Sequence, residues 1–211
     1  MIVCSVLRRY LNHGFWPFLR ALVRFSTAPL SRVAAYAPKD GWLADIGCGQ
    51  GHFLEYCRRA GFRQLLGVEP SSRATRRARG VLPESIAVIR GNAAELCLRS
   101  CNTLVVMDVL YLMSPEEQIS FIRHAASIIE PEGVILLKTM DSTRRIRQLF
   151  NVIQEFIAVR LFGITLGSAF HFRTPAEWIS ILEQQGLEAH SIPMWKWYIH
   201  PHVLIIGRRN R

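Results

Sequence analysis

One short stretch of the chain combines an acidic residue with three glycines at alternate positions. Asp45 stands near the end of an apolar run, and Gly47, Gly49 and Gly51 follow it. Glycine has no Cβ, so the backbone there can turn sharply and approach a ligand at van der Waals distance. A second apolar run ends in Glu69, 18 residues after Gly51, where a strand–helix–strand unit places a carboxylate against ribose hydroxyls. The two features together predict a site for a nucleoside-carrying cofactor.

A strand, a turn and a helix must hold these residues. The pattern predicts a buried strand over residues 43–46, a helix over about residues 52–60 and a second strand over residues 65–69. The dinucleotide-binding fingerprint Gly-x-Gly-x-x-Gly fits less well. It has no preceding acid, and its third glycine would come one residue later than Gly51.

The Asp45–Gly51 stretch matches the D/E-x-G-x-G-x-G signature of the class I S-adenosylmethionine-dependent methyltransferases, and Glu69 matches their ribose-binding acid. The chain resembles this family, in its small-molecule type, over about residues 40–207. The resemblance implies an α/β fold with a Rossmann-like, doubly wound sheet of seven strands. The sheet is expected to be mostly parallel with an antiparallel C-terminal strand. It also implies S-adenosyl-L-methionine as the cofactor and methyl transfer as the activity.

The resemblance also assigns roles to individual residues. The glycine turn should cradle the methionine and ribose, Asp45 should attract the ammonium group, and Glu69 should bind the ribose hydroxyls. Asn92 stands where the family often has an aspartate that contacts adenine, and its amide oxygen can accept the same hydrogen bond. The expected cofactor-binding residues are Asp45, Gly47, Cys48, Gly49, Gly51, Glu69, Pro70, Asn92, Ala93 and Asp108.

Methyl transfer from a sulfonium is an in-line displacement, so alignment and desolvation supply much of the acceleration. A hydroxyl or carboxyl acceptor can also need a base, for which histidine is best suited near neutral pH. His171, between two phenylalanines after a glycine-flanked segment, is the first candidate, and Tyr111 is the second expected catalytic residue. His200 and His202 are further candidates. A hydrogen-bonded structural role is the alternative for each of them.

The composition indicates one domain with an anionic partner. Among 211 residues the formal net charge is +10, and 23 of the 26 basic residues are arginine, which pairs well with phosphate and carboxylate. Lipid headgroups, nucleic acid or an acidic carrier protein would fit, and a soluble protein with a high pI is the alternative. The five cysteines form neither a paired framework nor a zinc pattern, which indicates reduced thiols in the cytoplasm. Neither an export signal nor a membrane-spanning run is expected.

Residues 1–39 differ from the rest, so we expect an N-terminal amphipathic helical segment before a methyltransferase domain over residues 40–211. The segment has six basic residues and no acid, and its apolar residues recur at helical spacing. We expect two helices separated at Gly14. They either lie on an anionic membrane surface, as a peripheral attachment, or pack over the domain. Both alternatives remain open.

After residue 69, strand and helix patterns alternate as in a parallel doubly wound sheet. Ser114 and Thr174 each begin a capping box with a proline at the first helical position, which predicts two helix starts. A long amphipathic helix is expected over residues 144–162. The remaining expected strands cover residues 87–90, 103–107, 133–138, 187–192 and 202–207.

The acceptor is expected to be a small apolar or lipid-like molecule, methylated on oxygen. This expectation rests on the N-terminal segment and on the aromatic residues within 150–172 and 195–198. The segment from Asp108 to Tyr111 lacks the pattern of enzymes that methylate base amines, and the chain has no Pro-Cys dipeptide for methylation of a pyrimidine carbon. Nucleic acid is therefore less favoured as a partner. The alternatives are an RNA methyltransferase, a catalytically silent cofactor-binding module and a membrane-associated scaffold.

Overall fold

The computed structural model describes residues 1–92, 100–140, 170–194 and 202–210. Several sequence expectations lie outside the described residues: Ala93, the helix over residues 144–162, the aromatic residues at 195–198, and His200.

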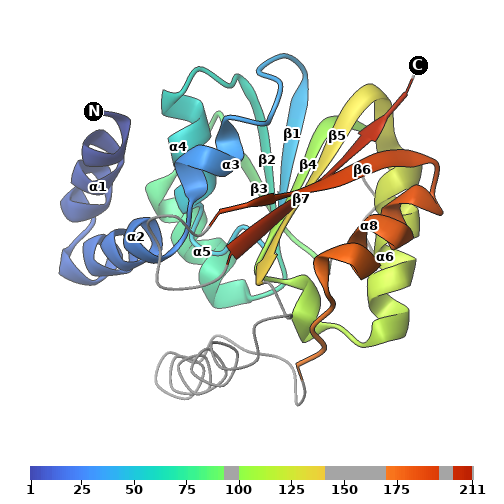
Figure 1. The fold of residues 1–211 in the computed structure, drawn as a ribbon. Coiled ribbons are helices and arrows are strands. Elements are labelled where there is room, and N and C mark those ends of the chain that lie inside the picture. The colour runs from blue at the N-terminus through green and yellow to red at the C-terminus, as the bar shows by residue number, and fades with distance from the viewer. Residues whose placement is uncertain (93–99, 141–169, 195–201, 211) are drawn as a thin grey trace.

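Over the described residues, the protein has one sheet of seven strands in the order β3-β2-β1-β4-β5-β7-β6 (Figure 1). The pairs β1–β2, β1–β4, β2–β3 and β4–β5 are parallel, whereas β7 is antiparallel to both β5 and β6. The predicted doubly wound fold with one antiparallel C-terminal strand is therefore confirmed. The strands are β1 (Trp42–Ile46), β2 (Gln64–Glu69), β3 (Ala87–Arg90), β4 (Cys101–Met107), β5 (Ile129–Met140), β6 (Leu187–Pro193) and β7 (His202–Arg209).

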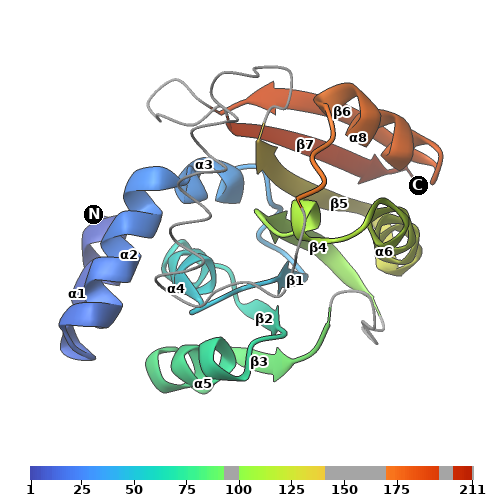
Figure 2. The same cartoon turned by 90° about the horizontal axis from the view of Figure 1, so that it is seen from below.

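Helices cover both faces of the sheet (Figure 2). Successive residues of a strand point to opposite faces, so Leu43 joins a core cluster with α4 and Ala44 joins one with α6. In open sheets of this kind a ligand binds beyond the carboxyl ends of the strands, where the chain order reverses. Here that point lies between β1 and β4. The covering helices are α3 (Leu30–Ala34), α4 (His52–Arg59) and α5 (Ser72–Val81) on one face, and α6 (Pro115–Ile128) and α8 (Pro175–Glu183) on the other.

The predicted helix starts are confirmed. Ser114 accepts a hydrogen bond from the Glu117 backbone N–H while the Glu117 side chain accepts from the Ser114 backbone, and Thr174 and Glu177 repeat the arrangement. These boxes satisfy backbone donors that a helix start leaves unpaired. They fix where α6 and α8 begin, and both beginnings lie at the carboxyl edge of the sheet.

The N-terminal residues form a helical hairpin that packs on the domain. Helices α1 (Ile2–Asn12) and α2 (Phe15–Thr27) are separated at Gly14, whose φ is 114°. Val6, Tyr10 and Ala21 are fully buried with Val81 of α5, and the Arg9 Nε–H donates to the Val81 carbonyl at 2.6 Å. One side of the hairpin therefore covers α4 and α5. In the described part of the chain, no helix is long and apolar enough to cross a membrane.

Candidate cofactor and active site

The glycine turn joins β1 to α4 with left-handed backbone at three positions. The φ angles of Gly47, Gly49 and Gly51 are 75°, 56° and 78°, values that side chains rarely tolerate. A Cβ on Gly47 would lie 2.3 Å from Val109, and one on Gly51 would lie 2.5 Å from Leu82. A Cβ on Gly49 would meet nothing within 4 Å. Gly49 therefore faces open space that a ligand can enter.

Glu69 lies directly beside this turn. Its carboxylate accepts hydrogen bonds from the backbone N–H groups of Gly49 and Ser71, each at 2.9 Å. These two bonds fix the side chain at the end of β2. Since each carboxylate oxygen can accept more than one hydrogen bond, both oxygens keep capacity for a pair of hydroxyls. The arrangement suits the ribose role that the sequence predicts for Glu69.

Asp45 is a buried acid near the carboxyl end of β1. Asp45 is only 2% exposed, and its Oδ2 atom has no hydrogen-bond partner within the described residues. Burial raises the Asp45 pKa to about 7; nearby Arg24 lowers it and nearby Glu69 raises it further. A buried carboxylate oxygen without a partner is costly, and a cationic ligand group would satisfy it. The site therefore fits the ammonium group of S-adenosylmethionine.

Cofactor binding should release a proton from Asp45 below about pH 7. The ligand's ammonium favours the carboxylate form, which is the minor form below the raised pKa, so affinity should fall about tenfold per pH unit below pH 7 and level off above it. Calorimetry with S-adenosylhomocysteine in buffers of different ionisation enthalpy measures the protons released. We expect release at about pH 6 and little at about pH 8. Asp45→Asn should bind weakly and release none, and equal release from both proteins would contradict the assignment.

A second acid, Asp108, directly follows β4 and lies between two cations. Lys138 Nζ is 2.6 Å from Oδ1, and Arg24 Nη1 is 2.8 Å from Oδ2. Burial alone would raise the Asp108 pKa, but Lys138 and then Arg24 hold it well below its usual range. Asp108 is also a non-glycine residue with positive φ, at 61°. Its expected contact with the cofactor stays a prediction, and its carboxylate serves these two ion pairs.

Arg24 is a further candidate site residue, which sequence reasoning missed. It comes from α2, 84 residues before Asp108, yet its guanidinium lies close enough to influence the pKa of Asp45 and of His52. The available signal was the lack of any acid in residues 1–39, which leaves Arg24 no local partner. Its position beside Asp45 makes it suited to an anionic group, such as the carboxylate of the cofactor's methionine end.

The other N-terminal helix contacts the glycine turn itself. The Tyr10 hydroxyl donates to the Gln50 carbonyl at 2.8 Å, and its ring lies 4.6 Å from the His52 ring. Burial, together with Arg24 and Arg20, lowers the His52 pKa to about 3, so the imidazole is neutral near neutral pH. Through Tyr10 and Arg24, the N-terminal hairpin contacts both the glycine turn and the carboxyl end of β4.

The two predicted catalytic residues meet beside the carboxyl end of β4. Tyr111 lies in the short helix η2 (Leu110–Leu112), three positions after Asp108. Its ring stacks on Phe172 at a centroid distance of 5.0 Å and lies 6.0 Å from Phe170. The His171 backbone N–H donates to the Tyr111 carbonyl at 2.8 Å. The structure therefore joins residues 60 positions apart into one aromatic cluster, which consists of Tyr111, Phe170 and Phe172.

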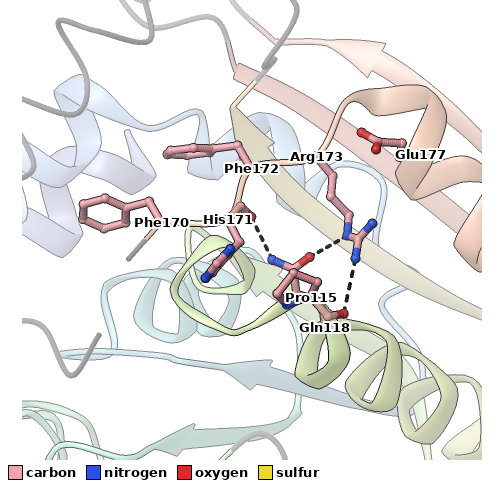
Figure 3. Close-up of a pocket in the computed structure, with 7 residues that line it drawn as sticks. All are labelled: Pro115, Gln118, Phe170, His171, Phe172, Arg173 and Glu177. Carbon is pink, nitrogen blue, oxygen red and sulfur yellow. Dashed lines mark hydrogen bonds between the residues drawn. The ribbon is translucent and has the colours of Figure 1, made fainter. Parts of the chain in front are cut away.

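A pocket of about 290 Å³ borders the same segment (Figure 3). Gln118 organises it, because its amide nitrogen donates to the His171 carbonyl at 2.8 Å and its oxygen accepts from Arg173 Nε at 2.6 Å. Figure 3 shows Phe170 and Phe172 on one side of the segment and Arg173 and Glu177 on the other. The residues lining the pocket are Pro115, Gln118, Phe170, His171, Phe172, Arg173 and Glu177.

The remaining predicted residues within the described part of the chain are Pro70, Asn92, Cys48 and His202. Pro70 and Asn92 are exposed after β2 and β3, at the edge where the adenine end of the cofactor is expected. Cys48 is buried, burial raises the pKa of its thiol, and its expected contact with the cofactor stays a prediction. His202 has Nε2 2.7 Å from the Thr27 carbonyl, so it connects β7 to the end of α2.

Residues 16–192 match a protein family described as a methyltransferase domain, and the chain belongs to this family. It is a class I S-adenosylmethionine-dependent methyltransferase, and S-adenosylmethionine is its cofactor. The Asp45, Gly49 and Glu69 geometry fits that cofactor. No curated protein matches the chain in sequence.

Solved structures show the same fold at low sequence identity. The methyltransferase bound to the Trm112 activator of Haloferax volcanii is 15% identical, with a TM-score of 0.74, 91% of this chain covered and 93% of that one. Magnesium protoporphyrin IX methyltransferase from Synechocystis, with bound S-adenosylhomocysteine, is 18% identical, with a TM-score of 0.64 and coverages of 86% and 80%. Human N-acetylserotonin methyltransferase is 16% identical, with a TM-score of 0.69 and coverages of 92% and 55%.

Proposed function

We propose that the protein transfers the methyl group of S-adenosylmethionine to an oxygen atom of a small apolar or lipid-like acceptor. The aromatic cluster of Tyr111, Phe170 and Phe172, with His171 bonded to it through the backbone, carries this proposal. Tyr111 lies in η2, just after β4, the strand whose carboxyl end lies beside the expected cofactor site. Stacked rings offer an apolar surface, and the histidine adds one group that can accept a proton.

In this reaction, the chain's own residues would have the following roles. Bound S-adenosylmethionine supplies an electrophilic methyl group on a sulfonium. Asp45 and Arg24 hold opposite charges at the methionine end, and Glu69 fixes the ribose. The aromatic cluster excludes water and orients the acceptor for in-line attack. His171 takes the proton from the acceptor oxygen, and Tyr111 is the second candidate for that role.

Two fold neighbours with small-molecule names, the protoporphyrin and N-acetylserotonin enzymes, support a small acceptor. An RNA methyltransferase is the second candidate, because α5 carries four arginines and no acid. Formation of S-adenosylhomocysteine separates the two when wild type is offered phenols, carboxylic acids, amines and structured RNA in turn. Turnover of hydroxyl or carboxyl compounds alone would support the proposal, and turnover of RNA or amines alone would overturn it.

Glu69→Ala tests the cofactor half of the site. The variant should bind S-adenosylhomocysteine more weakly by roughly 1–3 kcal/mol, because hydrogen bonds to a charged acceptor are lost. Isothermal calorimetry gives the affinity, and thermal unfolding shows whether the variant is folded. Glu84→Ala, which removes an exposed carboxylate between α5 and β3, is the matched control and should bind like wild type. Equal affinity for both variants would remove Glu69 from the site.

A further inference from the structure

The outer side of α2 carries an apolar stripe that the domain does not cover. Phe15, Trp16, Leu19, Leu22 and Val23 recur at helical spacing, so they share one side of the helix. Phe15 and Trp16 are 62% and 60% exposed, and Val23 is 52% exposed. Ala21 and Phe25, on the other side, belong to the buried cluster with α1. The hairpin therefore packs on the domain with one side of α2 and leaves the stripe exposed.

The surroundings of this stripe are cationic. Residues 1–39 contain no acid, and Arg8 is exposed on α1. Burial lowers the Arg77 pKa, and Arg20 of α2 and Arg73 of α5 lie close enough to Arg77 for their like charges to lower it further. Helix α5 carries four arginines without an acid, and only Arg79 among them has a described bond to the backbone of β3. An apolar stripe thus borders a surface of one charge sign.

We propose that the outer stripe of α2 and the adjoining arginines dock on an anionic lipid surface. Lipid offers both components, since acyl chains accept the aromatic and aliphatic side chains and acidic headgroups attract the arginines. A second copy of the chain would bring like charges together, and nucleic acid would leave the stripe exposed. Trp16 has the amphipathic ring typical of the interface between headgroups and acyl chains.

Docking on this face would leave α2 between the lipid and the cofactor site, because Arg24 lies on the side of the helix opposite the stripe. Arg24, on the same helix, reaches Asp108 at the carboxyl end of β4. The docking itself stands apart from the proposed function, because vesicle binding is measured without turnover.

The experiment is co-sedimentation of the full chain with vesicles at low salt. One set of vesicles is equal parts phosphatidylcholine and phosphatidylglycerol, and the other is phosphatidylcholine alone. We expect binding to the anionic set, weakened by added salt. Phe15→Gln with Trp16→Gln should lower the partition coefficient about tenfold or more. Trp42→Gln is the matched control, because Trp42 is 48% exposed at the amino end of β1, away from the hairpin.

Arg8→Gln provides a second, independent variant, and it should reduce both the binding and its dependence on salt. All the substituted side chains are exposed, so unfolding temperatures should stay close to that of wild type. The proposal is overturned if the full chain ignores anionic vesicles at low salt, or if the double variant binds them like wild type. Self-association that depends on Phe15 and Trp16, without vesicle binding, would assign the stripe to a second copy and also overturn it.

Discussion

Gly49→Val should abolish measurable binding of S-adenosylhomocysteine while leaving the domain folded. Gly49 is the one glycine of the turn around which a Cβ would meet only open space. A valine side chain would fill that space and occupy the ligand's position. Loss of van der Waals approach and displacement of the ligand together should cost at least about a hundredfold in affinity. Calorimetry with the purified variant measures the effect directly.

Gly49 also has a positive φ of 56°, so valine will strain the backbone as well as block the ligand. Gly186 provides a control for the loss of overall stability, because its φ is 78° and a Cβ there also meets nothing within 4 Å. Gly186→Val, at the end of α8, should cost a similar 1–2 kcal/mol or so of stability and leave cofactor affinity unchanged. Affinity lost equally in both variants would show that loss of overall stability, rather than blocked space, is responsible.

His171→Ala should lower kcat roughly 10²–10⁴-fold and leave cofactor affinity nearly unchanged. The segment should keep its place, because both backbone groups of His171 are already bonded, to Tyr111 and to Gln118. Any acceptor that wild type methylates can serve, with S-adenosylhomocysteine formation as the readout. The pH profile of kcat adds a second measurement, since loss of a general base removes the acidic limb.

Two further variants are needed to interpret the His171→Ala result. His190→Ala removes an exposed histidine on β6 and should turn over like wild type. Tyr111→Phe keeps the stacking on Phe172 and removes only the hydroxyl, so it tests the second candidate without disturbing the aromatic cluster. An unchanged rate in His171→Ala, with a lower rate in Tyr111→Phe, would transfer the base role to the tyrosine. Unchanged rates in both would leave the reaction to alignment alone.

The cofactor half of the site can be predicted from the sequence because its determinants are local. The run from Asp45 to Gly51 forms one strand end and one turn, and Glu69 ends the neighbouring strand. The order of residues alone brings them together once the strands are parallel. Capping boxes at Ser114 and Thr174 were equally visible, since a cap involves a residue and the one three positions later.

The rest of the site depends on contacts between distant segments. Nothing in the spacing of α2 shows that Arg24 would pair with Asp108, because the direction in which the hairpin folds back is a tertiary choice. The stacking of Tyr111 on Phe172 likewise requires the chain beyond β5 to return to η2. The raised pKa of Asp45 follows from burial, which periodicity indicates only coarsely. Such features follow from packing, and local patterns do not encode them.

The bond between His202 and Thr27 has a consequence for how the molecule is made. It spans 175 residues, and β7, which carries His202, inserts between β5 and β6 after both flanking strands have left the ribosome. We expect α2 to be held by both of its contacts, Arg24 with Asp108 and Thr27 with His202, only after β7 has joined the sheet. Contacts so distant along the chain form slowly, because a large loop must close first. The cofactor site is therefore finished late in folding, and a chain still being synthesised exposes the hairpin before it can hold its cofactor.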